Sequence, residues 1–223
     1  YLLHLKTVIT LAIDNEWLDR NPFSRFKMKN KPSERVFLIE EELTTIIETP
    51  ILNRRLSEVR DIFVFCCLTG LSYSDVKSLS SNDISKGIDG KMWIRKHRKK
   101  TGSLSRIALV PYAVELLERY KDHPEANTKG ILLPVISNSR MNLYLKDVGA
   151  LCGIDKKLTV HMARHTFGTY TATLNVPIET IGQMMGHKSI KTTQIYAKII
   201  DKKIADDMND FSNKLPEFKV KVS

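Results

Sequence analysis

One stretch of the chain reads His161-Met162-Ala163-Arg164-His165-Thr166-Phe167-Gly168-Thr169, and a second reads Gly186-His187-Lys188-Ser189-Ile190-Lys191-Thr192-Thr193-Gln194-Ile195-Tyr196. Together they place an arginine and histidines ahead of a tyrosine on the next helical stretch. Guanidinium and imidazole groups can neutralise phosphoryl oxygens as a phenol attacks a phosphodiester, because negative charge builds on those oxygens. Such a reaction needs no metal ion and no cofactor. The two stretches therefore indicate covalent chemistry on a phosphodiester.

These motifs agree in order, spacing and flanking residues with those of the tyrosine recombinases, the phage-integrase family, and the chain resembles that family over nearly its whole length. The resemblance implies the catalytic-domain fold of these enzymes, which is mainly α with a small antiparallel β-sheet. It also implies a DNA strand-transferase that cleaves and rejoins DNA at specific sites through a 3′-phosphotyrosine, in the integration or excision of a mobile element.

The composition is basic, with 35 Lys and Arg against 25 Asp and Glu, a formal net charge of +10 and a pI of about 9.5. A protein that lies along phosphates is expected to carry such a charge, although a solvated basic surface explains it equally well. At 223 residues and 42% hydrophobic, the chain can bury one good core and part of a second.

The three cysteines, Cys66, Cys67 and Cys152, show neither a disulfide framework nor metal-ligand spacing, so a reducing compartment is expected. Neither a secretory leader nor an 18-residue apolar stretch is visible. The expectation is a cytoplasmic protein with no membrane partner.

The first 18 residues predict an amphipathic helix that Asn21-Pro22-Phe23 ends, because the residue before a proline is pushed out of the helical region. In the family that the chain resembles, a helix ending in Asn-Pro-Phe closes the core-binding (SAM-like) domain, so residues 1–26 are expected to be the last helix of that domain. Residues 27–35 then form a linker, 36–200 the catalytic domain, and 201–223 a C-terminal helix and tail for contacts between protomers.

Apolar periodicity predicts the elements of the catalytic domain. Segment 56–69 has helical periodicity and is almost continuously apolar from Ile62 to Leu68, which predicts a core helix that stops at Gly70. Strands are predicted at 92–98 and 105–110, around a turn at Thr101-Gly102-Ser103. Further helices are predicted at 40–48, from 72 onward, and at 111–120, 139–151, 159–173, 177–185 and 192–199.

Tyr196 is the predicted nucleophile. A phenol has a pKa near 10 and needs cationic neighbours or a base as it attacks. The covalent phosphotyrosine conserves the energy of the broken bond, so rejoining needs no ATP. Arg164 and His161 lie three residues apart and project from one face of a helix, where Arg164 can make a forked pair of hydrogen bonds to the phosphate.

The other histidines receive different roles. His161 can donate to a non-bridging oxygen or relay the tyrosine proton. His187 follows a glycine at a helix end and is expected to reach the phosphate from the opposite side as a donor. His165 is assigned to a different side of the helix and to a structural role.

Lysines of the predicted hairpin supply the candidate general acid. The resemblance implies a lysine in this turn that protonates the departing 5′ oxygen, and both Lys99 and Lys100 fall there. Adjacent side chains on a strand point to opposite faces, so only one can serve; Lys100, directly before Thr-Gly, is favoured. Lys96, Lys99 and Arg95 are predicted DNA contacts, with solvated hairpin lysines as the alternative for Lys96 and Lys99.

The chain departs from the family pattern at Ser72, where the first of two phosphate-binding arginines is expected after Thr69-Gly70-Leu71. Arg98 is the proposed substitute, because it lies two residues before Lys100 and strand alternation sends both side chains to one face. Asp75 is expected to hold nearby cations, with helix capping as the alternative. This variant resembles integrases of conjugative transposons and related mobile elements.

The expected partners are double-stranded DNA, further copies of the chain in a tetramer on DNA, and accessory DNA-bending proteins. A type IB topoisomerase would share the chemistry but act as a monomer, and the predicted tail argues against it. A catalytically dead DNA-binding module is the third alternative, and it rests on Ser72 alone.

Overall fold

The computed structural model describes residues 2–24, 26, 36–197 and the pairs 204–205, 208–209 and 211–212. The chain divides into two compact units, Tyr1–Glu34 and Arg35–Ser223. The domain assignment made from the sequence, with boundaries at 26, 35 and 200, stays a prediction. Most of the predicted C-terminal helix and tail at 201–223 lies outside the described residues.

In the first unit, α1 (Leu2–Asp14) ends earlier than the 18 residues predicted. The backbone reverses at Glu16, whose φ is +59°. The N–H groups of Trp17 and Leu18 both donate to the Ala12 carbonyl, which closes the end of the helix. A positive φ at glutamate has no sequence signal, so the pattern placed the end at the proline instead.

The second unit is built around α3 (Arg54–Thr69), which is buried from Glu58 to Cys67. A helix that is apolar around most of its circumference belongs in the centre of a domain. Asn53 caps its start by accepting from the Leu56 N–H, and Gly70 closes its end with φ of +66°. Against it pack α2 (Glu40–Glu48), α5 (Pro111–Arg119), α7 (Asn138–Leu151) and α8 (Val160–Thr173).

A three-stranded antiparallel sheet flanks these helices, in the order β1 (Ile84–Lys86), β2 (Met92–His97) and β3 (Leu104–Ala108). Ile94 of β2 pairs with Ile84 and Ile107, so one apolar row runs across the core face. The short α4 (Tyr73–Val76) precedes the sheet, and α6 (Pro124–Thr128) follows α5. The expected fold, mainly α with a small antiparallel sheet, is confirmed; β1 and α6 were missed because both are very short.

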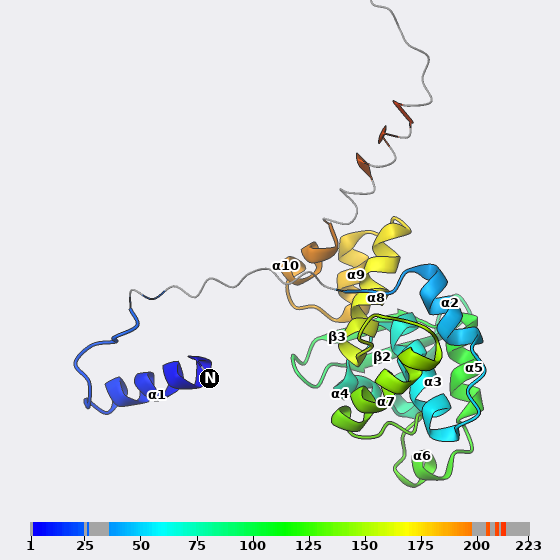
Figure 1. The fold of residues 1–223 in the computed structure, drawn as a ribbon, viewed down its shortest axis with the longest axis horizontal. Helices are drawn as coiled ribbons and strands as arrows, with labels where there is room; N and C mark the ends of the chain where they lie inside the picture. The colour runs from blue at the N-terminus through cyan, green and yellow to red at the C-terminus, as the bar shows by residue number, and fades with distance from the viewer. Residues whose placement is uncertain are drawn as a thin grey trace, which may run out of the picture. The chain divides into compact units, whose positions relative to one another are not determined.

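The last described elements lie beside the sheet. In Figure 1, α9 (Ile178–Met185) lies next to α8, and α10 (Ile190–Thr193) lies next to α9. A 3-10 turn at Gln194–Tyr196 follows α10, in place of the continuous helix predicted from 192 to 199. Phe167, Ile181, Met185 and Tyr196 form a second small apolar cluster there.

Gly70 generates a stability prediction. A Cβ at Gly70 would lie within 3.0 Å of three atoms of the Phe167 ring, and its φ is positive. Gly153 has the same positive φ but nothing within 4 Å of its Cβ position. Gly153→Ala should cost about 1–2 kcal/mol of unfolding free energy for the left-handed backbone, and Gly70→Ala roughly 1–3 kcal/mol more from the clash. Chemical denaturation measures both, and equal losses would contradict the close approach.

Candidate active site

Helix α8 carries Arg164 into the junction between three helices. Its guanidinium donates through one Nη to the carbonyl of Gly70, at the end of α3, and through the other to the carbonyl of Met185 at the end of α9, at 2.6 Å. Carbonyls at a helix C-terminus carry partial negative charge and favour a cation. Burial, together with the charge of Arg98, lowers the pKa of Arg164 to about 10, so the group stays cationic at neutral pH.

Tyr196 lies against the same helix and is only 2% exposed. Its hydroxyl is 3.1 Å from Nδ1 of His165, and Nε2 of His165 is 3.0 Å from Nε2 of His161. The three side chains form one hydrogen-bonded series. If the phenol donates to Nδ1 of His165, the Nε2–H of that ring is left to donate to His161. A proton leaving Tyr196 therefore has a path along the face of α8.

His165 differs from the sequence prediction. It was assigned to a different side of the helix from the other site residues, yet it joins Tyr196 to His161. The reason is its spacing of four residues from His161, which places both rings on one face of a helix.

Gly168 makes room for the tyrosine. A Cβ at this position would come within 2.6 Å of Cε2 of the Tyr196 ring. The ring can therefore pack directly on the backbone of α8. A glycine inside a helical pattern is the only sequence signal for this close approach, because such a residue costs helix stability and needs a packing reason.

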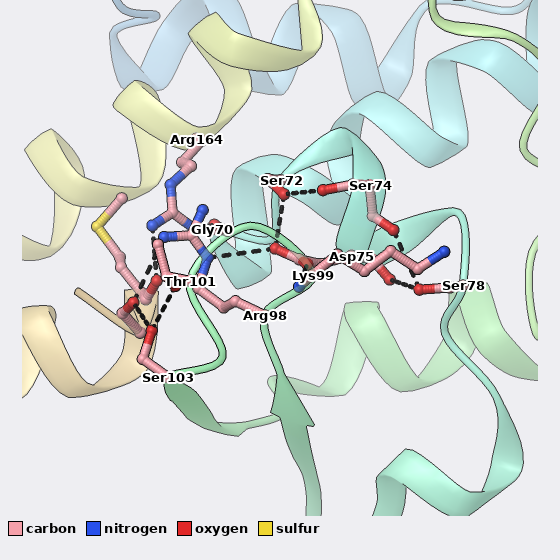
Figure 2. A network of polar contacts seen from close by, with 12 residues as sticks. Gly70, Ser72, Ser74, Asp75, Ser78, Arg98, Lys99, Thr101, Ser103 and Arg164 are labelled. Atoms are coloured by element: carbon pink, nitrogen blue, oxygen red, sulfur yellow. Dashed lines mark hydrogen bonds and ion pairs between the residues drawn. The ribbon is translucent and has the colours of Figure 1, made fainter. Parts of the chain in front are cut away.

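Asp75 organises the position where the first arginine was expected. Its carboxylate accepts from Ser72 Oγ at 2.6 Å, from the Lys99 N–H at 3.0 Å and from Arg98 Nε at 3.3 Å, as Figure 2 shows. Burial alone would raise the pKa of Asp75, but these hydrogen bonds and the charge of Arg98 lower it below its ordinary value. Asp75 lies within α4 and holds a cation from the hairpin.

Arg98 points inward from the hairpin, with its side chain 11% exposed. One Nη also donates to the carbonyl of Gly186, at 3.4 Å, and a Cβ on Gly186 would come within 2.7 Å of Arg98 Cδ. Glycine at 186 thus supplies both the left-handed turn after α9 and the space for Arg98. In Figure 2 the guanidinium groups of Arg98 and Arg164 lie next to each other.

An open cleft of about 520 Å³ joins these groups. Its cationic and imidazole lining comes from Arg98, Lys100, His161 and Arg164, and its neutral lining from Ser72, Tyr73, Ser74, Asn138, Asn142, Thr159 and Val160. Hairpin, α4, α7 and α8 therefore meet at one cavity. Four of the side chains predicted from the sequence line it together.

The remaining hairpin cations are placed differently from one another. Lys96 is buried, with its ammonium 2.8 Å from Asp83 Oδ2 and 2.8 Å from the Ser78 carbonyl. This arrangement does not fit the predicted DNA contact, because alternation along β2 turns Lys96 to the core face with Ile94. Lys99 and Arg95 are exposed, and Arg95 lies opposite Arg106 on β3.

His187 follows Gly186 and is held by Thr193, whose Oγ1 is 2.8 Å from its Nδ1. Burial, with the charges of Arg164 and Arg98, lowers the pKa of His187 to about 4. The ring is therefore neutral at neutral pH. If Thr193 donates to Nδ1, Nε2 carries the proton and is the donor; the donor role toward a phosphate stays a prediction.

The described part of the chain holds no group of three or more His, Cys, Asp or Glu side chains that could bind a metal ion. Among its helices, none combines the length and the apolar character that a membrane span requires.

Comparison with known proteins identifies the family of the chain. The model of the phage integrase family matches residues 36–203. The tyrosine recombinase XerC of Pediococcus pentosaceus is 23% identical over 219 residues, which cover 93% of this chain and 72% of that protein. A tyrosine recombinase of Pseudothermotoga lettingae is 25% identical over 198 residues, with 85% of this chain and 63% of that protein covered.

Solved structures share the fold. The crystal structure of XerA recombinase superposes with a TM-score of 0.60 at 22% identity, covering 93% of this chain and 74% of that one. The Tn1549 transposon integrase in complex with circular intermediate DNA superposes with a TM-score of 0.61 at 17% identity, covering 86% and 72%.

The neutral His187 predicts a pH dependence of stability. Its folded pKa of about 4 lies below the ordinary 6.5, so the unfolded chain binds the proton more tightly. The stability that the neutral ring contributes is present above pH 6.5 and is lost as the pH falls toward about 4. As the pH falls through this range, the melting temperature of the parent chain should therefore fall more than that of His187→Gln. A difference independent of pH would contradict the neutral ring.

Proposed function

The chain belongs to the phage integrase family of tyrosine recombinases, and we propose that it cleaves and rejoins DNA at specific sites with Tyr196 as the nucleophile. One observation carries the proposal: Arg98, Lys100, His161 and Arg164 line a single cleft, and a hydrogen-bonded series runs from His161 through His165 to the Tyr196 hydroxyl. The cations that would bind the phosphate therefore lie beside the histidines that would take the phenol proton.

The reaction begins with attack of the Tyr196 oxygen on the phosphorus of the scissile phosphate. The phenol proton passes to His165 and the bond from phosphorus to the 5′ oxygen breaks. Lys100, exposed at the mouth of the cleft, gives a proton to the departing oxygen, which avoids expelling an alkoxide. Attack by the 5′ hydroxyl of a partner strand then reverses these steps and releases Tyr196.

Charge that develops on the phosphoryl oxygens meets Arg164, Arg98 and the neutral donor His187. Arg98 supplies the cation that Ser72 lacks. This role of Arg98 is supported by its ion pair with Asp75 and by its place in the same cleft as Arg164. Asp75 and the Gly186 carbonyl fix Arg98 before any phosphate arrives, so little reorganisation remains for the transition state. With a cation at this position, Ser72 is weak support for an inactive module.

Tyr196 must move before it can attack. The side chain is 2% exposed and packs on Gly168, whereas the cleft opens beside His161 and Arg164. We infer that binding of DNA shifts α10 and the 3-10 turn along α8, so that the Tyr196 oxygen reaches the cleft while the phenol stays within reach of His165. Until then the buried hydroxyl, bonded to His165, is kept from stray phosphates.

Double-stranded DNA is the proposed substrate, and its contacts include the exposed Arg95 and Lys99. The λ integrase and Tn1549 integrase structures are complexes with DNA. A tetramer on DNA, accessory bending proteins and a role in moving a mobile element complete the proposal. The net charge of +10 supports the binding of phosphates.

Tyr196→Phe tests the nucleophile. The variant should form no covalent adduct with a nicked suicide substrate, while its DNA affinity stays within about a few-fold, since phosphate contacts supply most of the binding. Tyr73→Phe is the matched control, because Tyr73 lines the same cleft and its hydroxyl donates to the Ile136 carbonyl. Denaturing gels resolve the adduct, and an adduct with Tyr196→Phe would overturn the assignment.

Arg98→Ala tests the substitute cation. Losing a preorganised charge should slow cleavage by about 100- to 1,000-fold, with little change in DNA affinity. Ser72→Arg in that background should restore part of the rate. Arg95→Ala removes the same charge from an exposed position on β2 and should cleave at nearly the parent rate. Full activity of Arg98→Ala would pass the role to another residue.

A further inference from the structure

The segment Val36–Ile39, which leads into the second unit, is fastened to the helix that carries the site. Leu38 is 2% exposed and Thr166 is 1% exposed. The Leu38 N–H donates to Thr166 Oγ1 at 3.0 Å, between residues 128 positions apart in the chain. A buried threonine hydroxyl on a helix can bond within its own helix, as Thr69 does to the Phe65 carbonyl. Thr166 instead accepts from another segment.

A second tie holds the backbone on both sides of Leu38. Lys156, which lies between α7 and α8, donates to the Phe37 carbonyl at 3.1 Å and pairs with Glu42 Oε2 at 2.6 Å. The same Glu42 oxygen accepts from the Ile39 N–H at 2.9 Å. We call these two ties, Leu38 to Thr166 and Phe37 through Lys156 to Glu42, the clasp. It leaves Leu38 no freedom to slide along α8.

The clasp contacts α8 beside Arg164 and His165, the two site residues whose placement depends on the position of this helix. Thr166 follows His165 directly and lies two residues after Arg164. The guanidinium of Arg164 is bonded at its far end to Gly70 and Met185, and His165 is bonded to Tyr196. A small shift or rotation of α8 would therefore misplace both groups, because interiors are close-packed and side chains have little room to compensate.

We propose that Thr166 is a positioning residue that ties the segment Val36–Ile39 to α8 and thereby fixes the placement of Arg164 and His165. The inference rests on the proposed function, because it concerns the same site.

Thr166→Val keeps the shape of the side chain and removes the acceptor, and Thr166→Ser keeps the acceptor. Single-turnover adduct formation at saturating DNA and DNA affinity are measured on the full chain. Thr166→Val should lower the cleavage rate about tenfold, the order expected for stranding one buried donor, with affinity within about twofold of the parent. Thr166→Ser should recover most of the rate.

The outer tie gives an independent variant that is easier to fold, because Lys156 is partly exposed. Lys156→Met should slow cleavage several-fold without loss of affinity. Lys157→Met is its matched control: it removes the same charge from the neighbouring exposed position, and it should cleave at the parent rate.

The outcomes separate two failures. If the parent chain forms no adduct, the proposed function fails before the clasp is tested. If the parent reacts and folded Thr166→Val reacts equally fast, or loses rate and affinity in proportion, the clasp has no positioning role. If melting curves show Thr166→Val unfolded, Lys156→Met decides: an unchanged rate overturns the inference, and a slower rate with intact affinity supports it.

Discussion

The fork of hydrogen bonds from Arg164 to the carbonyls of Gly70 and Met185 is the constraint on which the site depends. It joins the C-terminal ends of α3 and α9 to the middle of α8. A buried guanidinium without acceptors would be very costly, so the three helices can pack in this way only while the fork is satisfied. The same bonds present the cation at the wall of the cleft. Fold and site are therefore held by one side chain.

Around that fork, positive charge is concentrated and then partly balanced. Arg98 lies near enough to Arg164 to contribute to the lowering of its pKa, and both lower that of His187. Asp75 compensates Arg98 on one side only, through Nε. A bound phosphate would relieve the repulsion between the two guanidinium groups. The repulsion between the two cations thus lowers the stability of the fold at the site where an anion is expected to bind.

The sequence predicted the fold class and most helices, because apolar periodicity along α2, α5 and α9 is strong and the second half of α3 is a continuous apolar run. Short elements such as β1 and α6 carry too few residues for a pattern. Among site residues, the resemblance to the tyrosine recombinases indicated Arg164 and His161, and strand alternation relative to Lys100 indicated Arg98. The burial of Lys96 had no local signal, because its partner Asp83 lies on another element. The position of His165 beside His161 follows from their spacing of four residues on a helix.

The site keeps its electrophilic and nucleophilic halves apart. Arg98 and Arg164 are fixed by backbone carbonyls and by Asp75, so the phosphate-binding half needs no rearrangement. Tyr196 packs on Gly168, and its hydroxyl is within hydrogen-bond distance of His165, in a 3-10 turn of three residues. Short elements outside the main core open at lower free-energy cost than core helices. Movement is therefore expected of the nucleophile rather than of the cations, and the order of events becomes phosphate binding first and attack second.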